Sequence, residues 1–331
     1  MSEITIFKRL ILIATIITLC VVVLGAYVRL SDAGLGCPDW PGCYGTLTVP
    51  QSSEAIMHAE NSFPDKPIEA SKAWKEMIHR YLATSLGIFI LAIFVAAWRK
   101  RNLIKVTPWL PTALVGLVVF QGMLGMWTVT LLLKPAIVTA HLMGGMSTLA
   151  ILTWITHRHW GMISENYLTS KNMRFLVRGT LVILLIQIFL GGWTSTNYAA
   201  LACTDFPTCH GAWVPDMDFA NAFHWVRELG VDAAGKPLEI SAFVAIQWTH
   251  RIGALITFLY LGTLGLCLLR QPQLSKLASI MLLLLVVQVG LGIANLVLHL
   301  PLVLAVAHNM VAALLLITIV VLNSKITAQN K

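Results

Sequence analysis

The chain has 331 residues, of which 57% are hydrophobic and only 11% are charged. Soluble proteins carry about 25% charged residues, so the composition excludes an ordinary soluble domain and indicates a membrane protein. The net charge of +8 does not indicate nucleic-acid binding, because the basic residues lie in short clusters between apolar runs.

Eight apolar runs are long enough to cross a bilayer, which takes about 20 residues. They lie at residues 8–28, 78–98, 109–130, 136–156, 175–195, 244–269, 277–298 and 302–322. The first run has no clear small-residue cleavage site, so we expect a helix there rather than a signal peptide. The sequence predicts an all-α integral membrane protein of eight transmembrane helices, with both termini on one side.

Basic residues beside the runs indicate the cytoplasmic side. They fall on the side of the termini: Lys8, Arg9, Arg99, Lys100, Arg101, Lys105, Arg158, Lys171, Arg174, Arg270, Lys276, Lys325 and Lys331. All acidic residues except Glu3 and Glu165 fall on the other side. We therefore expect cytoplasmic termini and two long external loops, at about residues 29–77 and 196–243.

The two long loops contain the same motif, C-x-D-aromatic-P-x-C. It occupies residues 37–43 in one loop and 203–209 in the other. Three further matches follow in the same order: 77–80 with 248–251, 121–125 with 288–292, and 141–143 with 308–310. Four ordered matches at a shift of about 167 residues indicate a tandem duplication. We expect two four-helix halves, residues 1–170 and 171–331, related by a pseudo-two-fold axis along the membrane normal.

Four histidines are matched between the halves and lie near the external ends of even-numbered runs: His79, His141, His250 and His308. A single such histidine is usually a polar interfacial residue, but ionisable side chains inside a membrane are costly and often functional. Neutral imidazole binds haem iron, and facing helices of a bundle commonly supply the two ligands. Zinc would need further ligands, and only Glu76 is nearby. The sequence predicts haem ligation by His79 with His141 and by His250 with His308.

The halves differ in charge at a position beside these histidines. Glu76 lies three residues before His79, on the same helix face, whereas the matching residue of the second half is Gln247. A carboxylate beside a haem can act as a base or stabilise positive charge. The alternative is an interfacial acid paired with a neighbouring cation: Lys72, Lys75 or Arg80.

Arg80 and Arg251 directly follow the first histidine of each half. Arginine suits carboxylates such as haem propionates. An arginine whose stem lies along apolar surface while its charge reaches the interface explains the position equally well.

Four of the six cysteines lie in the external loops, as the pairs Cys37/Cys43 and Cys203/Cys209. Surroundings outside the cytosol favour disulfides, and both pairs are close enough in sequence to bridge within a loop. Cys20 and Cys267 lie in apolar runs and are expected to be packing residues. For Cys203/Cys209 we favour a loop staple. For Cys37/Cys43, a staple and a thiol redox role both stay open.

Taken together, these features resemble the haem A synthase family, in its bacterial form with cysteine pairs in the external loops. The resemblance covers nearly the whole chain. It rests on eight spans in two halves, the four histidines, the two cysteine pairs and Glu76. It implies a plasma (inner) membrane location in a bacterium, with the haem sites toward the external face.

The resemblance also implies a reaction. The first half would bind the substrate haem O through His79 and His141, and the second half a permanent haem b (iron protoporphyrin IX) through His250 and His308. The enzyme, an oxidoreductase, would oxidise the C8 methyl group of haem O to a formyl group, giving haem A for cytochrome c oxidase, with water as the oxygen source.

Further roles follow from the same resemblance. Glu76 would lie near the reacting methyl group and stabilise a carbocation-like centre, and Cys37 and Cys43 would serve catalysis or haem transfer. The implied partners are haem O and the protohaem farnesyltransferase that makes it. Membrane lipid and a second copy of the chain are further candidate partners, and nucleic acid is not one.

Two other functions compete with this interpretation. A di-haem cytochrome b that only carries electrons explains the four histidines, but it explains neither the difference between Glu76 and Gln247 nor the cysteine pairs. A haem exporter or chaperone predicts loops rich in tryptophan, which is met in part by Trp40, Trp74, Trp213 and Trp225.

Overall fold

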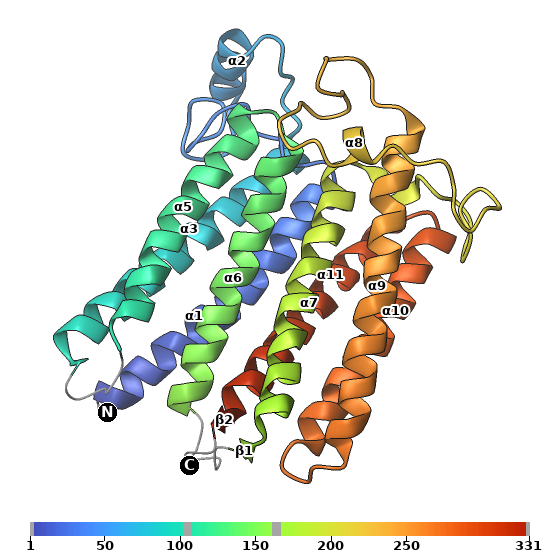
Figure 1. The fold of residues 1–331 in the computed structure, drawn as a ribbon. Helices are drawn as coiled ribbons and strands as arrows, with labels where there is room; N and C mark the ends of the chain where they lie inside the picture. Colours follow the sequence, from blue (N-terminus) through green and yellow to red (C-terminus); the bar gives the residue numbers. More distant parts are fainter. Residues whose placement is uncertain (1–2, 102–106, 161–166, 329–331) are drawn as a thin grey trace. The chain divides into compact units, whose positions relative to one another are not determined.

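The computed structural model describes residues 3–101, 107–160 and 167–328 (Figure 1). Within these residues, eight helices are long and apolar enough to cross a membrane, which confirms the predicted number. They are α1 (Glu3–Leu30), α3 (Ala70–Arg99), α5 (Trp109–Thr130), α6 (Pro135–Trp160), α7 (Lys171–Thr196), α9 (Ile240–Leu269), α10 (Ser275–Val297) and α11 (Leu302–Lys325). The protein is therefore a multi-pass membrane protein with a helical fold.

Most of the helices extend beyond the apolar runs because polar residues continue them into the interfaces. The clearest case is α3, which begins at Ala70 instead of near residue 78. Glu76 and His79 therefore both lie within one continuous helix. At the start of α7, the Ser170 side chain accepts a hydrogen bond from the Met173 N–H, as a helix N-cap does.

The shorter elements lie in the connections. They are α2 (Ser53–Ser62), the 3₁₀-helix η1 (Ala199–Leu201), α8 (Phe219–Ala222), β1 (Tyr167–Thr169) and β2 (Ile326–Ala328). The two strands pair in parallel, with Tyr167 opposite Ile326. Apart from isolated β-bridges in the loops, this small pairing is the one departure from an all-α fold among the described residues, and the sequence pattern did not predict it.

The first four spanning helices form a closed ring of contacts. α1 packs on α3, and α3 packs on α5. A Cβ atom at Gly125 of α5 would lie 3.5 Å from the His141 ring of α6, and one at Gly145 of α6 would lie 3.6 Å from Val22 of α1. Glycines at helix contacts allow the backbones to approach closely. The ring holds the two histidines of the first half on facing helices.

The last four spanning helices form a second ring with the same connectivity. α7 packs on α9, α9 on α10, α10 on α11, and α11 returns to α7. The chain divides into two compact units, Met1–Thr148 and Leu149–Lys331, with the division inside α6. The predicted boundary at residues 170 and 171 and the pseudo-two-fold axis stay predictions.

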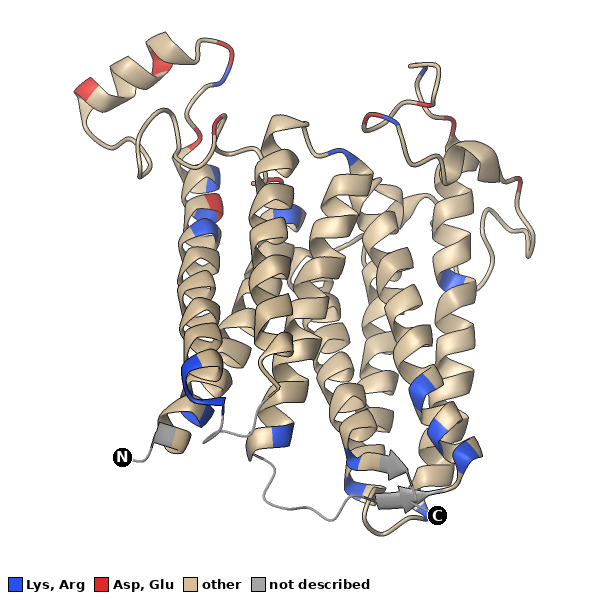
Figure 2. Cartoon of the chain, turned by 60° about the vertical axis from the view of Figure 1, so that its left-hand side comes forward, with Lys and Arg blue, Asp and Glu red and all other residues tan. Residues whose placement is uncertain are grey.

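Charges are distributed unevenly along the helices of each unit. Acidic residues gather in the α1–α3 and α7–α9 connections, and basic residues gather at the opposite helix ends (Figure 2). Lys105, Glu165 and Lys331, which belong to the predicted charge pattern, lie outside the described residues. The described charged residues follow the predicted pattern, with acidic loops at one end of the helices and basic residues at the other, and the predicted orientation in the membrane depends on this pattern.

Candidate functional site

Each external loop motif folds into a small disulfide-closed turn. Cys37 bonds to Cys43 and Cys203 to Cys209. The Asp39 carboxylate accepts hydrogen bonds from the backbone N–H groups of Tyr44 (2.6 Å) and Gly45 (2.9 Å). Both of these residues have a positive φ, 53° and 75°, and the aspartate satisfies the N–H groups that this turn exposes.

The second motif repeats the arrangement. The Asp205 carboxylate accepts hydrogen bonds from the Thr208 hydroxyl and from the N–H groups of His210 (2.6 Å) and Gly211 (3.0 Å). These hydrogen bonds, the one from Thr208 first, hold the pKa of Asp205 well below its usual value. The aspartate that both copies of C-x-D-aromatic-P-x-C share thus organises the turn through its carboxylate.

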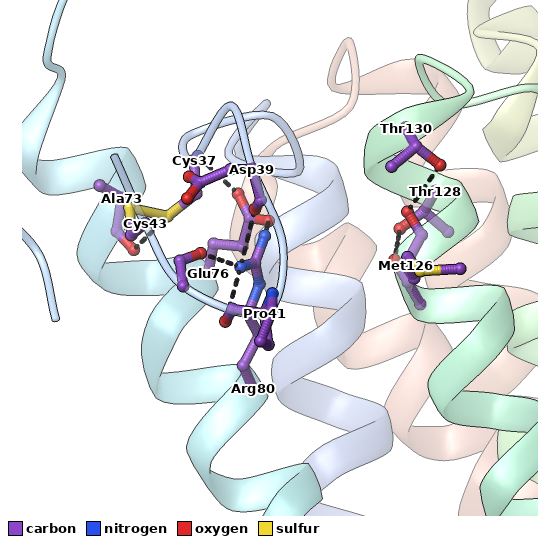
Figure 3. Close-up of polar contacts among 12 residues, drawn as sticks. Cys37, Asp39, Pro41, Cys43, Ala73, Glu76, Arg80, Met126, Thr128 and Thr130 are labelled. Carbon is purple, nitrogen blue, oxygen red and sulfur yellow. Dashed lines mark hydrogen bonds and ion pairs between the residues drawn. A yellow bond between two sulfur atoms is a disulfide. The ribbon is translucent and has the colours of Figure 1, made fainter. Parts of the chain in front are cut away.

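In the first half, two side chains of α3 fasten this turn to the helix (Figure 3). One Glu76 oxygen accepts a hydrogen bond from the Cys37 N–H at 3.0 Å, and the other pairs with the Arg80 guanidinium. The same guanidinium donates to the backbone carbonyls of Asp39 (3.1 Å), Pro41 (3.2 Å) and Gly42. Glu76 and Arg80 therefore act together on the disulfide loop.

In the second half, α9 fastens its loop with the corresponding residues. The Gln247 carbonyl oxygen accepts a hydrogen bond from the Cys203 N–H, and the Gln247 amide donates to the Ala200 carbonyl. Arg251 donates to the carbonyls of Thr208 (2.8 Å) and Cys203 (3.3 Å). In both halves, the side chain three residues before the histidine accepts a hydrogen bond from the N–H of the first loop cysteine.

What differs at this position between the halves is the charge. Glu76 and Gln247 are equally buried, each with 5% of its surface exposed. A glutamine accepts the same cysteine N–H without a charge, so the loop contact by itself does not require a carboxylate. The ion pair with Arg80 fits the alternative of a paired interfacial acid, while a chemical role for the carboxylate stays a prediction.

The four predicted ligand histidines occupy equivalent places in the two rings. All four side chains are half-buried, and the two of each half lie close enough to interact electrostatically, His79 with His141 and His250 with His308. The two histidines of each predicted pair thus lie near each other, and haem ligation by the pairs stays a prediction.

Each imidazole lies against a glycine on the neighbouring helix. A Cβ atom at Gly25 would lie 2.9 Å from His79 Cε1, one at Gly191 3.1 Å from His250 Cε1, one at Gly292 3.2 Å from His308 Cε1, and one at Gly125 3.5 Å from His141 Cε1. Contacts below about 3.4 Å are tighter than ordinary packing allows, so three of these positions leave no room for a side chain. The repeated arrangement indicates four built seats for imidazole rings.

The donor set is compatible with haem ligation. The Nδ1 atoms of His79, His141 and His308 are buried, and among the described residues none has a hydrogen-bond partner. A buried polar atom without a partner is costly, so these rings keep hydrogen-bonding capacity that the described residues do not use, and haem ligation by them stays a prediction. In the described chain no group of three or more His, Cys, Asp or Glu side chains could hold a metal ion. Paired imidazoles on facing helices suit haem iron rather than a protein-caged ion.

Sequence reasoning missed the functional place of several residues. The arginines after the histidines were assigned to propionates or to the interface, but Arg80 and Arg251 bind the loop backbone. Gly125 and Gly292 were part of a matched run, and their spacing from the histidines carried no signal by itself. Gly25 and Gly191 follow a leucine in both helices, a two-residue match too short to notice without the structure.

Known proteins resemble the chain over nearly its whole length. The COX15-CtaA family, described as cytochrome oxidase assembly protein, matches residues 8–320. A protein of Shewanella oneidensis named heme A synthase is 46% identical over 319 residues, which cover 94% of each chain. Proteins with the same name from Caulobacter sp. strain K31 (28% identical, 92% of each chain) and Bacillus licheniformis (26% identical, 91% of this chain and 89% of the relative) also match.

The match spans both rings, both disulfide loops and all four histidine seats. The family that the sequence motifs indicated is therefore confirmed by similarity along the whole chain. This protein belongs to the COX15-CtaA family of cytochrome oxidase assembly proteins.

Proposed function

We propose that this protein is a haem A synthase, an oxidoreductase that converts a methyl group of haem O into the formyl group of haem A. The name of the relatives supports this function, because one of them is 46% identical over 94% of the chain. The observation that carries it within the chain is the charge difference between Glu76 and Gln247, which make the same contact with a loop cysteine in the two halves.

The proposed reaction has a simple balance. The methyl group and one water give a formyl group, and four electrons and four protons leave. We assign the substrate haem O to His79 and His141, and a resident haem b to His250 and His308. When bound, the haem b iron would supply one-electron chemistry, passing the four electrons one at a time to an electron acceptor outside the protein.

Glu76 is the residue of the first half suited to handle positive charge. It lies in α3 three residues before His79, which places both on one face of the helix. Its carboxylate is held by Arg80 and by the Cys37 N–H, so its position depends on the closed loop. This contact gives the Cys37–Cys43 bridge a part in positioning the carboxylate, in addition to the redox role that the sequence left open.

We also propose the location and partners. The acidic loops and basic helix ends (Figure 2) support an inner bacterial membrane with cytoplasmic termini, external disulfide loops and haem sites toward the external face. The proposed donor of haem O is the protohaem farnesyltransferase of the same membrane.

The test is the conversion of haem O by the purified protein, with the extracted haem analysed by mass spectrometry. We expect a formyl haem from the wild type. Glu76→Gln should bind haem normally, because Gln247 shows that an amide accepts the cysteine N–H, but it should form no product. Gln247→Glu is the matched control, which adds a carboxylate in the second half and should leave conversion intact.

Two results would count against the proposal. A wild-type protein that holds haem at both sites and never forms a formyl haem would favour an electron-carrying cytochrome. Wild-type conversion by the Glu76→Gln variant would remove the chemical role of Glu76 while leaving the family function in place.

A further inference from the structure

His250 differs from the other three histidines in what surrounds its ring. The Gln187 amide nitrogen, from α7, lies 3.1 Å from His250 Nδ1 and donates to the His250 backbone carbonyl at 3.2 Å. The Nδ1 atoms of His79, His141 and His308 have no hydrogen-bond partner in the described part of the chain. Within the described part of the chain, His250 is therefore the one of the four whose Nδ1 has a side-chain hydrogen bond, while His308 is contacted at its other ring nitrogen, Nε2, by the Gln288 amide at 3.3 Å.

The second half makes room for this glutamine with a glycine. A Cβ atom at Gly253, on the helix of His250, would collide with the Gln187 amide oxygen and lie 2.8 Å from Leu190 Cδ1. Gln187 and Gly191 are four residues apart on α7, so they share a face of the helix, and both lie against the His250 ring.

The first half has apolar residues at both positions. Aligning Gly25 with Gly191, the two glycines that face the first histidine of each half, places Val21 opposite Gln187. Aligning His79 with His250 places Leu82 opposite Gly253. The second half thus combines a polar Gln187 with a small Gly253. The first half has the apolar, branched Val21 and the larger Leu82 at the corresponding positions. Valine and leucine offer the His79 ring no hydrogen bond.

A second hydrogen bond to an axial histidine matters for retention of the metal. The ring nitrogen that does not bind the metal usually donates to a fixed acceptor, which sets the tautomer and the orientation of the ring. Losing such a partner typically lowers metal affinity by roughly 10- to 100-fold. In the structure the Gln187 nitrogen faces Nδ1, so Nδ1 is the acceptor of that hydrogen bond. When Nε2 binds iron, Nδ1 carries the proton, and turning the amide over would bring the Gln187 oxygen, a buried acceptor without a partner among the described residues, to the Nδ1–H group.

We propose that Gln187 is a positioning residue that makes the second haem site retentive, and that Val21 and Leu82 leave the His79 ring unfastened so that the first site exchanges its haem. This inference rests on the proposed function, in which the first haem is a substrate that enters and leaves. It explains how two sites with the same ligands hold one haem permanently and release the other.

The test measures haem loss and reduction potential in full-length protein. A His79→Ala background confines the bound haem to the second site. Haem transfer to excess apomyoglobin then gives the rate of loss. We expect Gln187→Met, which keeps the volume and removes the amide, to speed haem loss by roughly 10- to 100-fold.

A second variant separates hydrogen bonding from packing. Gln187→Glu offers a stronger acceptor to Nδ1, which makes the imidazole a stronger donor to iron. The haem reduction potential should therefore fall in Gln187→Glu and rise in Gln187→Met. If Gln187 only filled space, the two variants would not shift the reduction potential in opposite directions.

The reciprocal change tests the first site. Val21→Gln combined with Leu82→Gly, in a His250→Ala background, should slow haem loss from the first site toward the rate of the second. Unchanged loss rates and potentials in both Gln187 variants, with wild-type haem content, would overturn the inference and leave the proposed function standing. A wild-type protein without haem at either histidine pair would instead overturn both.

Discussion

The four glycines that face the histidines give a graded series of substitutions. In Gly25→Ala the new methyl carbon would lie 2.9 Å from His79 Cε1, so the ring must move by several tenths of an ångström or rotate. Inserting a methyl group into a packed site costs about 1–3 kcal/mol. Ligation holds the ring in place and opposes that movement, so the cost falls on haem affinity. The corresponding loss is roughly 5- to 150-fold.

The other three positions should follow the distances. Gly191→Ala (3.1 Å) and Gly292→Ala (3.2 Å) should weaken haem binding less than Gly25→Ala, and Gly125→Ala (3.5 Å) should leave it nearly unchanged. Each variant is measured by haem titration in a chain whose other histidine pair is disabled by a His→Ala exchange. Gly122→Ala in α5 is the control, because a Cβ atom there meets no described atom within 4 Å.

The reasoning would be refuted if the haem affinities of the four variants did not follow the distances between the new methyl carbon and the imidazole ring. If Gly125→Ala weakened haem binding as much as Gly25→Ala, the glycines would not be the seats of the imidazoles. The control also has a direction, since alanine is favoured over glycine inside a helix by about 1 kcal/mol. Gly122→Ala should therefore bind haem normally and unfold at the same or a slightly higher temperature.

Two further predictions concern the external loops. Arg80→Lys should speed hydrogen exchange of residues 36–46 while the haem spectrum is kept. The reason is that one ammonium cannot replace a guanidinium that reaches Glu76 and three backbone carbonyls. Unchanged hydrogen exchange would contradict the role of Arg80 in holding the loop. The depressed pKa of Asp205 means that its stabilisation of the loop is present above the ordinary carboxyl pKa of about 4 and is lost only as the pH falls below it. Hydrogen exchange of residues 203–211, corrected for its intrinsic pH dependence, should stay slow down to about pH 4 and be fast at neutral pH in Asp205→Asn; equal exchange in both proteins would contradict the role of the carboxylate.

Much of the architecture could be predicted from the sequence because it is periodic and duplicated. Apolar length alone determines a membrane span, since a bilayer requires about 20 apolar residues. The ordered matches between the halves identified the four histidines, the cysteine pairs and the inequality of Glu76 and Gln247. Each of these features is a residue type at a repeated position, which a single chain displays without its folded form.

What the tertiary structure decided are contacts between residues far apart in the chain. Nothing in the spacing showed that Glu76 and Arg80 hold the backbone of the loop at Cys37 and Gly42, because hydrogen bonds to main-chain groups leave no mark on residue type. Nor could it show that Gln187 reaches His250, a contact across 63 positions between two helices. The sequence determined which groups are present in duplicate, and packing decided which of them are fastened, because fastening depends on the space that neighbouring helices leave.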